Sequence, residues 1–162
     1  MLDGSGRLPS WSRRGLHLVY LRPDRANEDR SALVLYDFAE DRYTASLREP
    51  WCSSVSIPVA WSPDAKQFAV CADKPAQLML VDAADECVVK QRLSLDKIGR
   101  VDSMAWLAGG SLVLAVDGRL LMCTSPETEW KLEPVPIQPE GRDNRLVCWT
   151  KAGPVFVSVS QP

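Results

Sequence analysis

The sequence predicts an all-β protein built from repeated four-stranded antiparallel units, and three observations lead to that expectation. A tryptophan recurs in one register at Trp11, Trp61, Trp106 and Trp149, at separations of 50, 45 and 43 residues. Each of these tryptophans is followed by a turn of about four small or polar residues and then by an apolar run. The runs are short, aliphatic and bounded by Gly, Pro or Asp, which is typical of strands that are buried on both faces.

The first unit is expected over residues 8–50. Its first strand is expected to end at Trp11. The other three strands are expected to cover Leu16–Tyr20, Ser31–Asp37 and Tyr43–Leu47. A polar insert with the sequence RPDRANEDR, residues 22–30, separates the second strand from the third. Length variation of this kind is tolerated in loops far better than in strands.

The second unit is expected over residues 51–97. Its first three strands are predicted from the segments VAW, QFAVC and AQLMLVD. The fourth segment has two interpretations, because a helix over 85–97 would align Cys87, Val88, Leu93 and Leu95 in one stripe. The repeat favours a strand over 87–93 instead.

The third unit is expected over residues 98–144, and residues 145–162 supply only the first two strands of a fourth. In the third unit Asp117 and Gly118 separate the runs SLVLAV and RLLMCT. This dipeptide predicts a hairpin with a type I′ turn, because both central residues of that turn need a positive φ. A fourth strand is expected over 130–135.

Four-stranded units that repeat every 40 to 50 residues are typical of β-propeller blades. We therefore predict a single propeller-type domain over 1–162 with about three and a half blades, which is a partial or incomplete propeller. The repeating tryptophans are expected to pack between neighbouring blades. Because an unclosed ring leaves open sheet faces and an unpaired edge, we expect the chain to associate with itself or to be completed by another chain.

The second unit carries a family resemblance. WSPDA at 61–65, followed by an apolar strand and then LMLVDAADE, resembles the WSPDG turn and the strand-ending aspartate of WD40 and TolB-like propeller repeats. With its repeats, the resemblance covers residues 8–159. It implies a protein–protein interaction scaffold built from WD40-like repeats, as part of or subunit in a larger assembly, and it brings no catalytic residue with it.

Charge, hydropathy and cysteine content exclude several classes of protein. The chain has 19 basic and 21 acidic residues, so its net charge of −2 argues against a dedicated nucleic-acid binder. Its first residues lack the apolar stretch of a signal peptide, and no window is apolar enough for a membrane span. We expect a cytoplasmic protein, with the nucleus as an alternative, that is not secreted. Five cysteines without a CxxC motif are expected to be free thiols.

The search for catalytic chemistry predicts no enzyme. His17 is the only histidine, and it lies in a predicted strand rather than beside a nucleophile. Carboxylates cluster near Asp37 and again near Asp82, but these are equivalent turns, where aspartate is favoured because it caps its own turn. No catalytic residue, cofactor site or metal site is predicted.

Surface residues of the first unit are the predicted binding site. The insert at 22–30 and the connection at 48–55 are both expected to open onto one face, beside the boundary of the first two units. Trp51 lies outside the tryptophan register, and Trp and Arg are enriched among the residues that dominate interface energy. We therefore predict that Arg22, Arg25, Arg48 and Trp51 form a protein-binding patch. A solvated loop without a partner is the alternative for this stretch.

Two other functions stay open on the sequence. The chain could be the accessory propeller region of a larger enzyme, as in the peptidases that resemble the TolB-like repeats. It could also be an RNA-associated propeller, whose affinity would fall steeply with salt.

Overall fold

The structure is a computed structural model that describes residues 7–12, 16–23, 31–49, 58–73, 76–84, 87–124, 128, 130–135, 144–150 and 153–158. Within these ranges every regular element is a β-strand. No helix long and apolar enough to cross a membrane occurs in this part of the chain. The prediction of an all-β protein is confirmed.

The strands form three four-stranded antiparallel sheets and one two-stranded sheet, which we call units 1 to 4. Unit 1 contains β1 (Arg7–Trp11), β2 (His17–Pro23), β3 (Ser31–Asp37) and β4 (Arg42–Glu49). Unit 2 contains β5 (Val59–Trp61), β6 (Gln67–Asp73), β7 (Ala76–Asp82) and β8 (Val88–Ser94). Unit 3 contains β9 (Val101–Trp106), β10 (Leu112–Val116), β11 (Arg119–Cys123) and β12 (Leu132–Pro134). Unit 4 contains β13 (Asn144–Thr150) and β14 (Gly153–Ser158).

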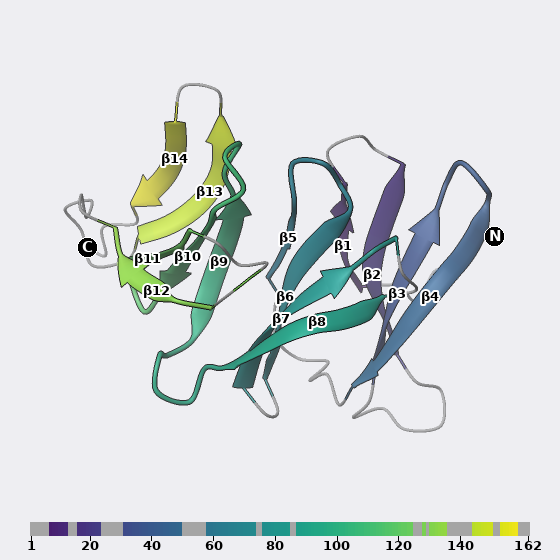
Figure 1. The fold of residues 1–162 in the computed structure, drawn as a ribbon, viewed down its shortest axis with the longest axis horizontal. Coiled ribbons are helices and arrows are strands. Elements are labelled where there is room, and N and C mark those ends of the chain that lie inside the picture. Colours follow the sequence, from purple (N-terminus) through teal and green to yellow (C-terminus); the bar gives the residue numbers. More distant parts are fainter. Residues whose placement is uncertain are drawn as a thin grey trace.

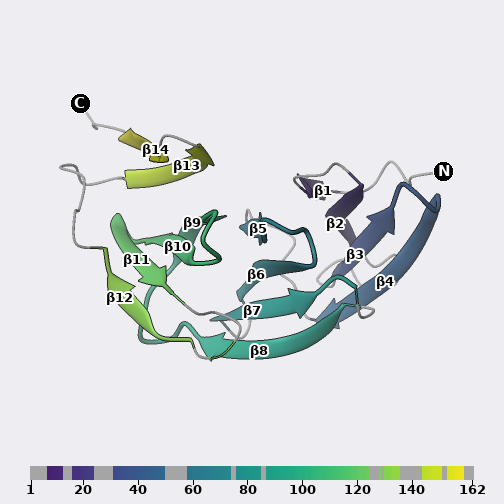
Figure 2. The same ribbon diagram turned by 45° about the horizontal axis from the view of Figure 1, so that its top comes forward.

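The units stand side by side along an arc, in chain order (Figures 1 and 2). In Figure 2 the first strands of the units lie toward the inside of the arc, and β4, β8 and β12 lie on its outside. Each four-stranded sheet is a simple meander, with its strands hydrogen-bonded in sequence order. The arc is not closed, so the expectation of an incomplete propeller is confirmed.

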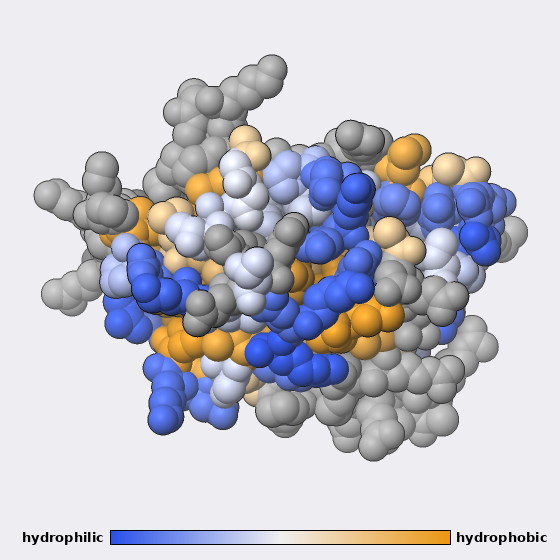
Figure 3. Space-filling model, viewed as in Figure 1, coloured by the Kyte–Doolittle hydropathy of each residue, from blue (hydrophilic) through white to orange (hydrophobic). Residues whose placement is uncertain are grey.

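The fourth strand of unit 2 settles the choice between strand and helix. Residues 88–94 form β8, which pairs with β7 from Asp82 opposite Val88 to Gln77 opposite Ser94. Exposed and half-buried residues alternate along β8, because it is the outermost strand of its sheet. Hydrophilic side chains lie over this strand in Figure 3, with apolar residues beside them.

Buried serines close equivalent turns in units 1 and 2. Ser62 Oγ accepts a hydrogen bond from the Gln67 N–H at 3.0 Å, and the Ser62 N–H donates to the Gln67 carbonyl at 2.9 Å. Ser12 Oγ accepts from the His17 N–H at 3.1 Å, and the Ser12 N–H donates to the His17 carbonyl at 2.9 Å. Both serine side chains therefore satisfy backbone groups where the first strand turns into the second.

Positive φ angles occur where the turns need them. Asp117 has a φ of 46° and Gly118 a φ of 76°, so the predicted type I′ hairpin is confirmed. The turn after the tryptophan of unit 2 ends on Ala65 with a φ of 62°, and the equivalent turn of unit 3 ends on Gly110 with a φ of 86°. An alanine thus occupies a left-handed position where glycine would be free of strain.

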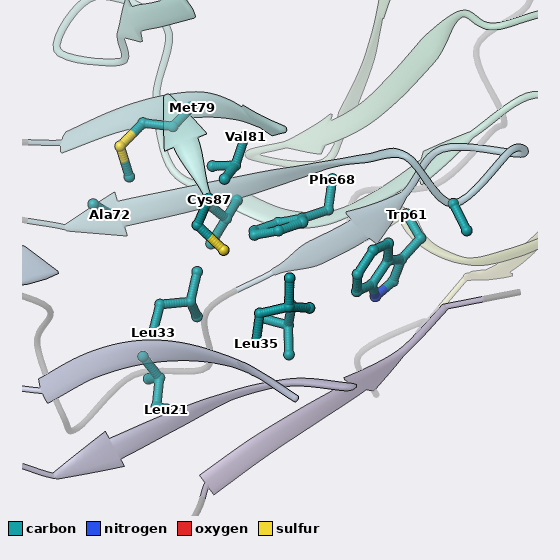
Figure 4. Close-up of a cluster of buried hydrophobic side chains, with 12 residues drawn as sticks. Leu21, Leu33, Leu35, Trp61, Phe68, Ala72, Met79, Val81 and Cys87 are labelled. Atoms are coloured by element: carbon teal, nitrogen blue, oxygen red, sulfur yellow. The ribbon is translucent and has the colours of Figure 1, made fainter. Parts of the chain in front are cut away.

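The core consists of layers between neighbouring units. Figure 4 shows the layer between units 1 and 2, where Leu33 and Leu35 of β3 face Trp61 and Phe68 of unit 2. A second layer joins Ala69, Cys71 and other residues of unit 2 to unit 3. Because alternate residues of β6 enter different layers, the strand is buried on both faces, as its continuous apolar run predicts.

Two of the registered tryptophans link the units directly. The indole N–H of Trp61 donates to the Ser10 carbonyl of unit 1 at 3.2 Å. The indole N–H of Trp106 donates to the Ala60 carbonyl of unit 2 at 2.9 Å. Both side chains are buried, so the prediction of packing between blades is confirmed for these two residues.

Candidate functional site

One face of unit 1 carries a row of large side chains that lies across the whole sheet. The strand register pairs Trp11 with Leu18, Leu18 with Tyr36 and Tyr36 with Tyr43. Residues directly opposite in antiparallel strands share a face, so the four side chains lie side by side. We call the face that carries this row the open face.

The open face of unit 1 corresponds to the face by which unit 2 contacts unit 1. The equivalent row of unit 2 runs from Trp61 through Phe68 and Val81 to Val89, and it packs into the layer between the two units. In unit 1 the same face points away from unit 2. It is therefore the surface on which a preceding blade would pack.

Aromatic rings cluster on the open face. Trp11 stacks on Phe38 with ring centroids 4.9 Å apart, and Phe38 meets Tyr36 edge-on at 4.8 Å. Tyr43 contacts the other side of the Tyr36 ring at 5.2 Å. Tyr36 is thus buried beneath two rings, whereas Trp11, Phe38 and Tyr43 are 53%, 38% and 42% exposed. Among the described residues no second unit covers Trp11, so the expected packing between blades is not observed for this tryptophan.

The hydroxyl of Tyr36 fixes the turn at the edge of this face. It donates a hydrogen bond to the carboxylate of Asp41, the last residue of the turn before β4. That hydrogen bond, with desolvation and the charge of Asp41, raises the pKa of Tyr36 to about 12. The tyrosine consequently stays neutral and acts as a hydrogen-bond donor.

The predicted patch is only partly placed by the structure. Arg22 lies inside β2 rather than in the insert, because the ladder continues past it to the pair Pro23 and Ser31. Its guanidinium carbon lies 5.8 Å from the centre of the Tyr43 ring, in a cation–π arrangement. The interpretation of Arg22 as a loop residue is therefore wrong, and it belongs to the open face.

Arg48 also lies in a strand, near the end of β4. Ala32 pairs with Arg22 on one side and with Arg48 on the other, so the two arginines occupy one row at the same end of the sheet. Arg25 and Trp51 lie outside the residues that the structure describes. Sequence reasoning missed Phe38 and Tyr43, although Tyr43 lies within a predicted strand.

A cleft of about 540 Å³ lies at the turn end of units 1 and 2. Its ionisable lining residues come from both units. They are His17, Asp37 and Arg42 from unit 1, with Asp64 and Lys66 from unit 2. The Ser62 hydroxyl, followed by the Lys66 backbone N–H, holds the pKa of Asp64 below its usual range. The carboxylates of Asp64 and Asp37 thus accept hydrogen bonds from backbone N–H groups of their own turns and stabilise those turns.

His17 has a structural environment in this cleft. Its Nε2 lies 3.7 Å from Asp37 Oδ2, and its ring stacks on that of Trp61 at 6.0 Å. The other oxygen of Asp37 accepts from the Ala39 N–H at 2.8 Å, and Asp82 accepts from the Ala84 N–H at 2.9 Å in the equivalent turn. The prediction that these aspartates cap their own turns is confirmed.

The described part of the chain contains no reactive thiol and no cluster of side chains that could bind a metal ion. Cys71, Cys87 and Cys123 are buried and form no disulfide bond. Burial, with a contribution from the charge of Asp82, raises the pKa of the Cys87 thiol to about 12, so that it is protonated and unreactive. Among these described residues no three His, Cys, Asp or Glu side chains are grouped to hold a metal ion.

No protein-family model and no curated protein sequence matches the chain. Solved β-propeller structures do match it. KlAtg21, solved in complex with the coiled coil of AgAtg16, aligns over 81% of this chain and 42% of its own, with 16% identity and a TM-score of 0.60. TolB from Acinetobacter baumannii aligns over 93% of this chain and 37% of its own, with 13% identity and a TM-score of 0.60.

A third match is the β-propeller domain of the Trilobed protease from Pyrococcus furiosus, whose description notes an open velcro topology. It aligns over 88% of this chain and 45% of its own, with 11% identity and a TM-score of 0.57. The chain thus spans less than half the length of each of these propellers. It has the β-propeller fold, as an unclosed part of such a ring.

Proposed function

We propose that this chain is a non-catalytic scaffold for protein–protein interaction and that it works within a larger assembly. The single observation that carries the proposal is the exposed aromatic cluster of Trp11, Phe38 and Tyr43 on the open face. Contiguous apolar surface of this kind marks interaction sites, and Trp, Tyr and Arg dominate the binding energy of protein interfaces. The compartment we propose is the cytoplasm or the nucleus.

The predicted patch extends this surface. Arg22 joins the aromatic cluster through Tyr43, and the backbone of Arg48 lies in the same row. We propose that Arg25 and Trp51, which lie outside the described residues, also contribute to partner binding. Arginine at the rim of an aromatic surface would add charge-assisted hydrogen bonds to a partner.

Site-specific photo-cross-linking in the cells that make the protein tests this function. A photoreactive phenylalanine analogue replaces Phe38, and a matched variant carries it at Val88, which is 43% exposed on β8. We expect discrete protein adducts from position 38 and not from position 88. Adducts at neither position, or equal adducts at both, would contradict a protein-binding role for the open face.

A second candidate is the accessory propeller region of a larger enzyme. The likeness to the propeller domain of the Trilobed protease favours it, since that propeller is one part of a peptidase. The length of the native gene product separates the two candidates. A catalytic domain joined to these residues in one polypeptide would favour the enzyme, and a chain of propeller repeats alone would favour the scaffold.

A further inference from the structure

We propose that the cleft between units 1 and 2 binds an aliphatic α-amino acid in its zwitterionic form. The cations of Arg42 and Lys66 would hold the carboxylate of the ligand. The carboxylates of Asp37 and Asp64 would hold its ammonium, and its side chain would lie against the apolar part of the lining. None of the described lining residues belongs to the row of the open face, so the inference goes beyond the proposed function and does not rest on it.

Unit 1 brings a histidine, an aspartate and an arginine to the cleft in one row. The strand register pairs His17 with Asp37 and Asp37 with Arg42, so the three residues lie next to one another across β2, β3 and β4. The ring of His17 stacks on Trp61, which places this row on the face that points toward unit 2. All three residues of the row line the cleft.

Unit 2 forms the opposite wall from two of its turns. Asp64, Ala65 and Lys66 lie in the turn between β5 and β6, and Ala83 and Ala84 follow the end of β7. The Ala83 N–H donates a hydrogen bond to the Lys66 carbonyl at 2.7 Å. This bond joins the two turns, so the wall is a single hydrogen-bonded surface.

The two aspartates of the lining have acceptor oxygens to spare. Asp37 uses Oδ1 to accept from the Ala39 N–H at 2.8 Å, and its Oδ2 lies 3.7 Å from His17 Nε2. Asp64 also uses Oδ1, which accepts from the Ser62 hydroxyl at 2.7 Å. Each unit therefore offers one carboxylate oxygen, Oδ2, that its own turn does not use.

The two permanent cations of the lining have donors to spare. Arg42 pairs with Glu40, but its side chain is 63% exposed and a guanidinium has five N–H donors. The ammonium of Lys66 has no ion-pair partner among the residues that the structure describes. Each unit thus supplies one carboxylate and one cation to the same cavity.

This balance of charge favours a ligand that carries both signs. A simple anion would be repelled by two carboxylates, and a simple cation would be repelled by Arg42 and Lys66. The apolar part of the lining consists of Leu16, which is 47% exposed, and the alanines of unit 2. The volume of about 540 Å³ lies in the range of roughly 300–1,000 Å³ that small-molecule pockets have. An aliphatic amino acid combines the two charges with an apolar side chain.

Calorimetric titration of the protein with three probes of matched shape tests the ligand class. The probes are L-leucine, isocaproate, which is leucine without its ammonium, and isoamylamine, which is leucine without its carboxylate. We expect saturable binding of leucine with a dissociation constant below about 1 mM. Isocaproate and isoamylamine should each bind at least about tenfold more weakly, because each loses one set of charge-assisted contacts.

Three variants test the place of binding. Lys66→Met keeps the length of the side chain without its charge, and it should weaken leucine binding at least about tenfold. Ala84→Leu adds bulk at an exposed lining residue without removing an interaction, and it should block leucine. The matched variant Lys97→Met removes an exposed lysine between β8 and β9, outside the described lining, and should leave the affinity unchanged. Thermal unfolding checks that each variant is folded.

Four outcomes would overturn the proposal. Isocaproate that binds as tightly as leucine would make the cleft an anion site, and isoamylamine that does so would make it a cation site. Absence of saturable leucine binding up to about 10 mM would leave no amino-acid site at all. Leucine binding that neither Lys66→Met nor Ala84→Leu weakens would place the ligand elsewhere. None of these results depends on the adducts expected at position 38, so the scaffold is judged separately.

Discussion

Trp11 and Trp61 hold the same position in two successive repeats, yet one is exposed and the other is buried. Both end a first strand, and both precede a buried serine that closes the following turn. Trp61 is buried because unit 1 lies against its face, whereas Trp11 is 53% exposed on a face that no described unit covers. The local structure around each tryptophan therefore depends on its own unit, whereas its burial depends on whether a neighbouring unit covers it.

The composition of the two faces follows this difference. The row of unit 2 continues from Trp61 through Phe68, Val81 and Val89, which are all hydrocarbon side chains. The row of unit 1 has Tyr36 and Tyr43 at the last two places. Tyrosine is suited to a surface that is covered in one state and wet in another, because its ring is apolar and its hydroxyl is polar.

Replacement of the two tryptophans by alanine should show the largest contrast. Trp61→Ala should lower the free energy of unfolding by about 3–5 kcal/mol, because it leaves a cavity between two sheets. Trp11→Ala should cost less than about 1 kcal/mol in the monomer, since most of its side chain is already in water. Urea denaturation below the concentration at which the chain associates measures both. Equal losses would show that Trp11 is covered in solution.

The next largest change in stability is expected from the turn of unit 2 that Ser62 closes. Ser62→Ala should lower the free energy of unfolding by about 1–3 kcal/mol, because the partly buried backbone N–H of Gln67 loses its side-chain acceptor. Unit 3 provides an internal control, since Leu107 occupies the corresponding place. Its N–H donates to the Ser111 carbonyl, and its carbonyl accepts from the Gly110 N–H. Leu107→Ser should therefore not stabilise the chain by a comparable amount. Thermal unfolding of both variants measures the difference.

The turns of units 2 and 3 have different residues, Ala65 and Gly110, at the equivalent left-handed position. Gly110→Ala should cost about 1 kcal/mol, because the new side chain meets no atom and only the positive φ opposes it. Ala65→Gly should change stability by less than about 1 kcal/mol, because relief of strain is offset by loss of a buried methyl group. A gain from Gly110→Ala in chemical denaturation would contradict this account.

The smallest expected effect is the loss of stability when Tyr36 ionises, and it is absent at neutral pH. The folded pKa of Tyr36 is raised to about 12, above the ordinary value of 10.0, so its contribution to stability is complete below pH 10 and is lost as the pH rises towards 12. Asp41→Asn removes the charge that raises this pKa, and asparagine tolerates the positive φ at this position. Ultraviolet difference spectra should then show Tyr36 ionising at lower pH than in the parent chain. An unchanged titration would mean that Asp41 does not hold the hydroxyl in solution.

Much of the local structure could be predicted from the sequence because its causes are local. The Asp117–Gly118 turn follows from the φ preferences of two residues, and the caps of Asp37 and Asp82 follow from side chains that bond to nearby N–H groups. The continuous apolar run of β6 requires two covering layers wherever the strand lies.

The candidate site was predicted only in part. The interpretation of Arg22 as a loop residue is wrong because a strand ends where its partner stops pairing, and the insert gives no local signal of the pair between Pro23 and Ser31. Arg48 lies in the same row as Arg22 for a similar reason, since Ala32 pairs with both. Those pairs join segments that are distant in the sequence.

The repeat, the strands, the turns and the tryptophan register of this protein could all be predicted from its amino-acid sequence. Each depends on side-chain volume, backbone preference or alternation over a few residues, and these act within one unit. The burial of Trp61, the exposure of Trp11 and the contact between Tyr43 and Arg22 depend instead on how the strands and units pack in three dimensions. Burial depends on which face of a sheet the neighbouring unit covers. A sequence pattern that is the same in every unit cannot distinguish a covered face from an open one.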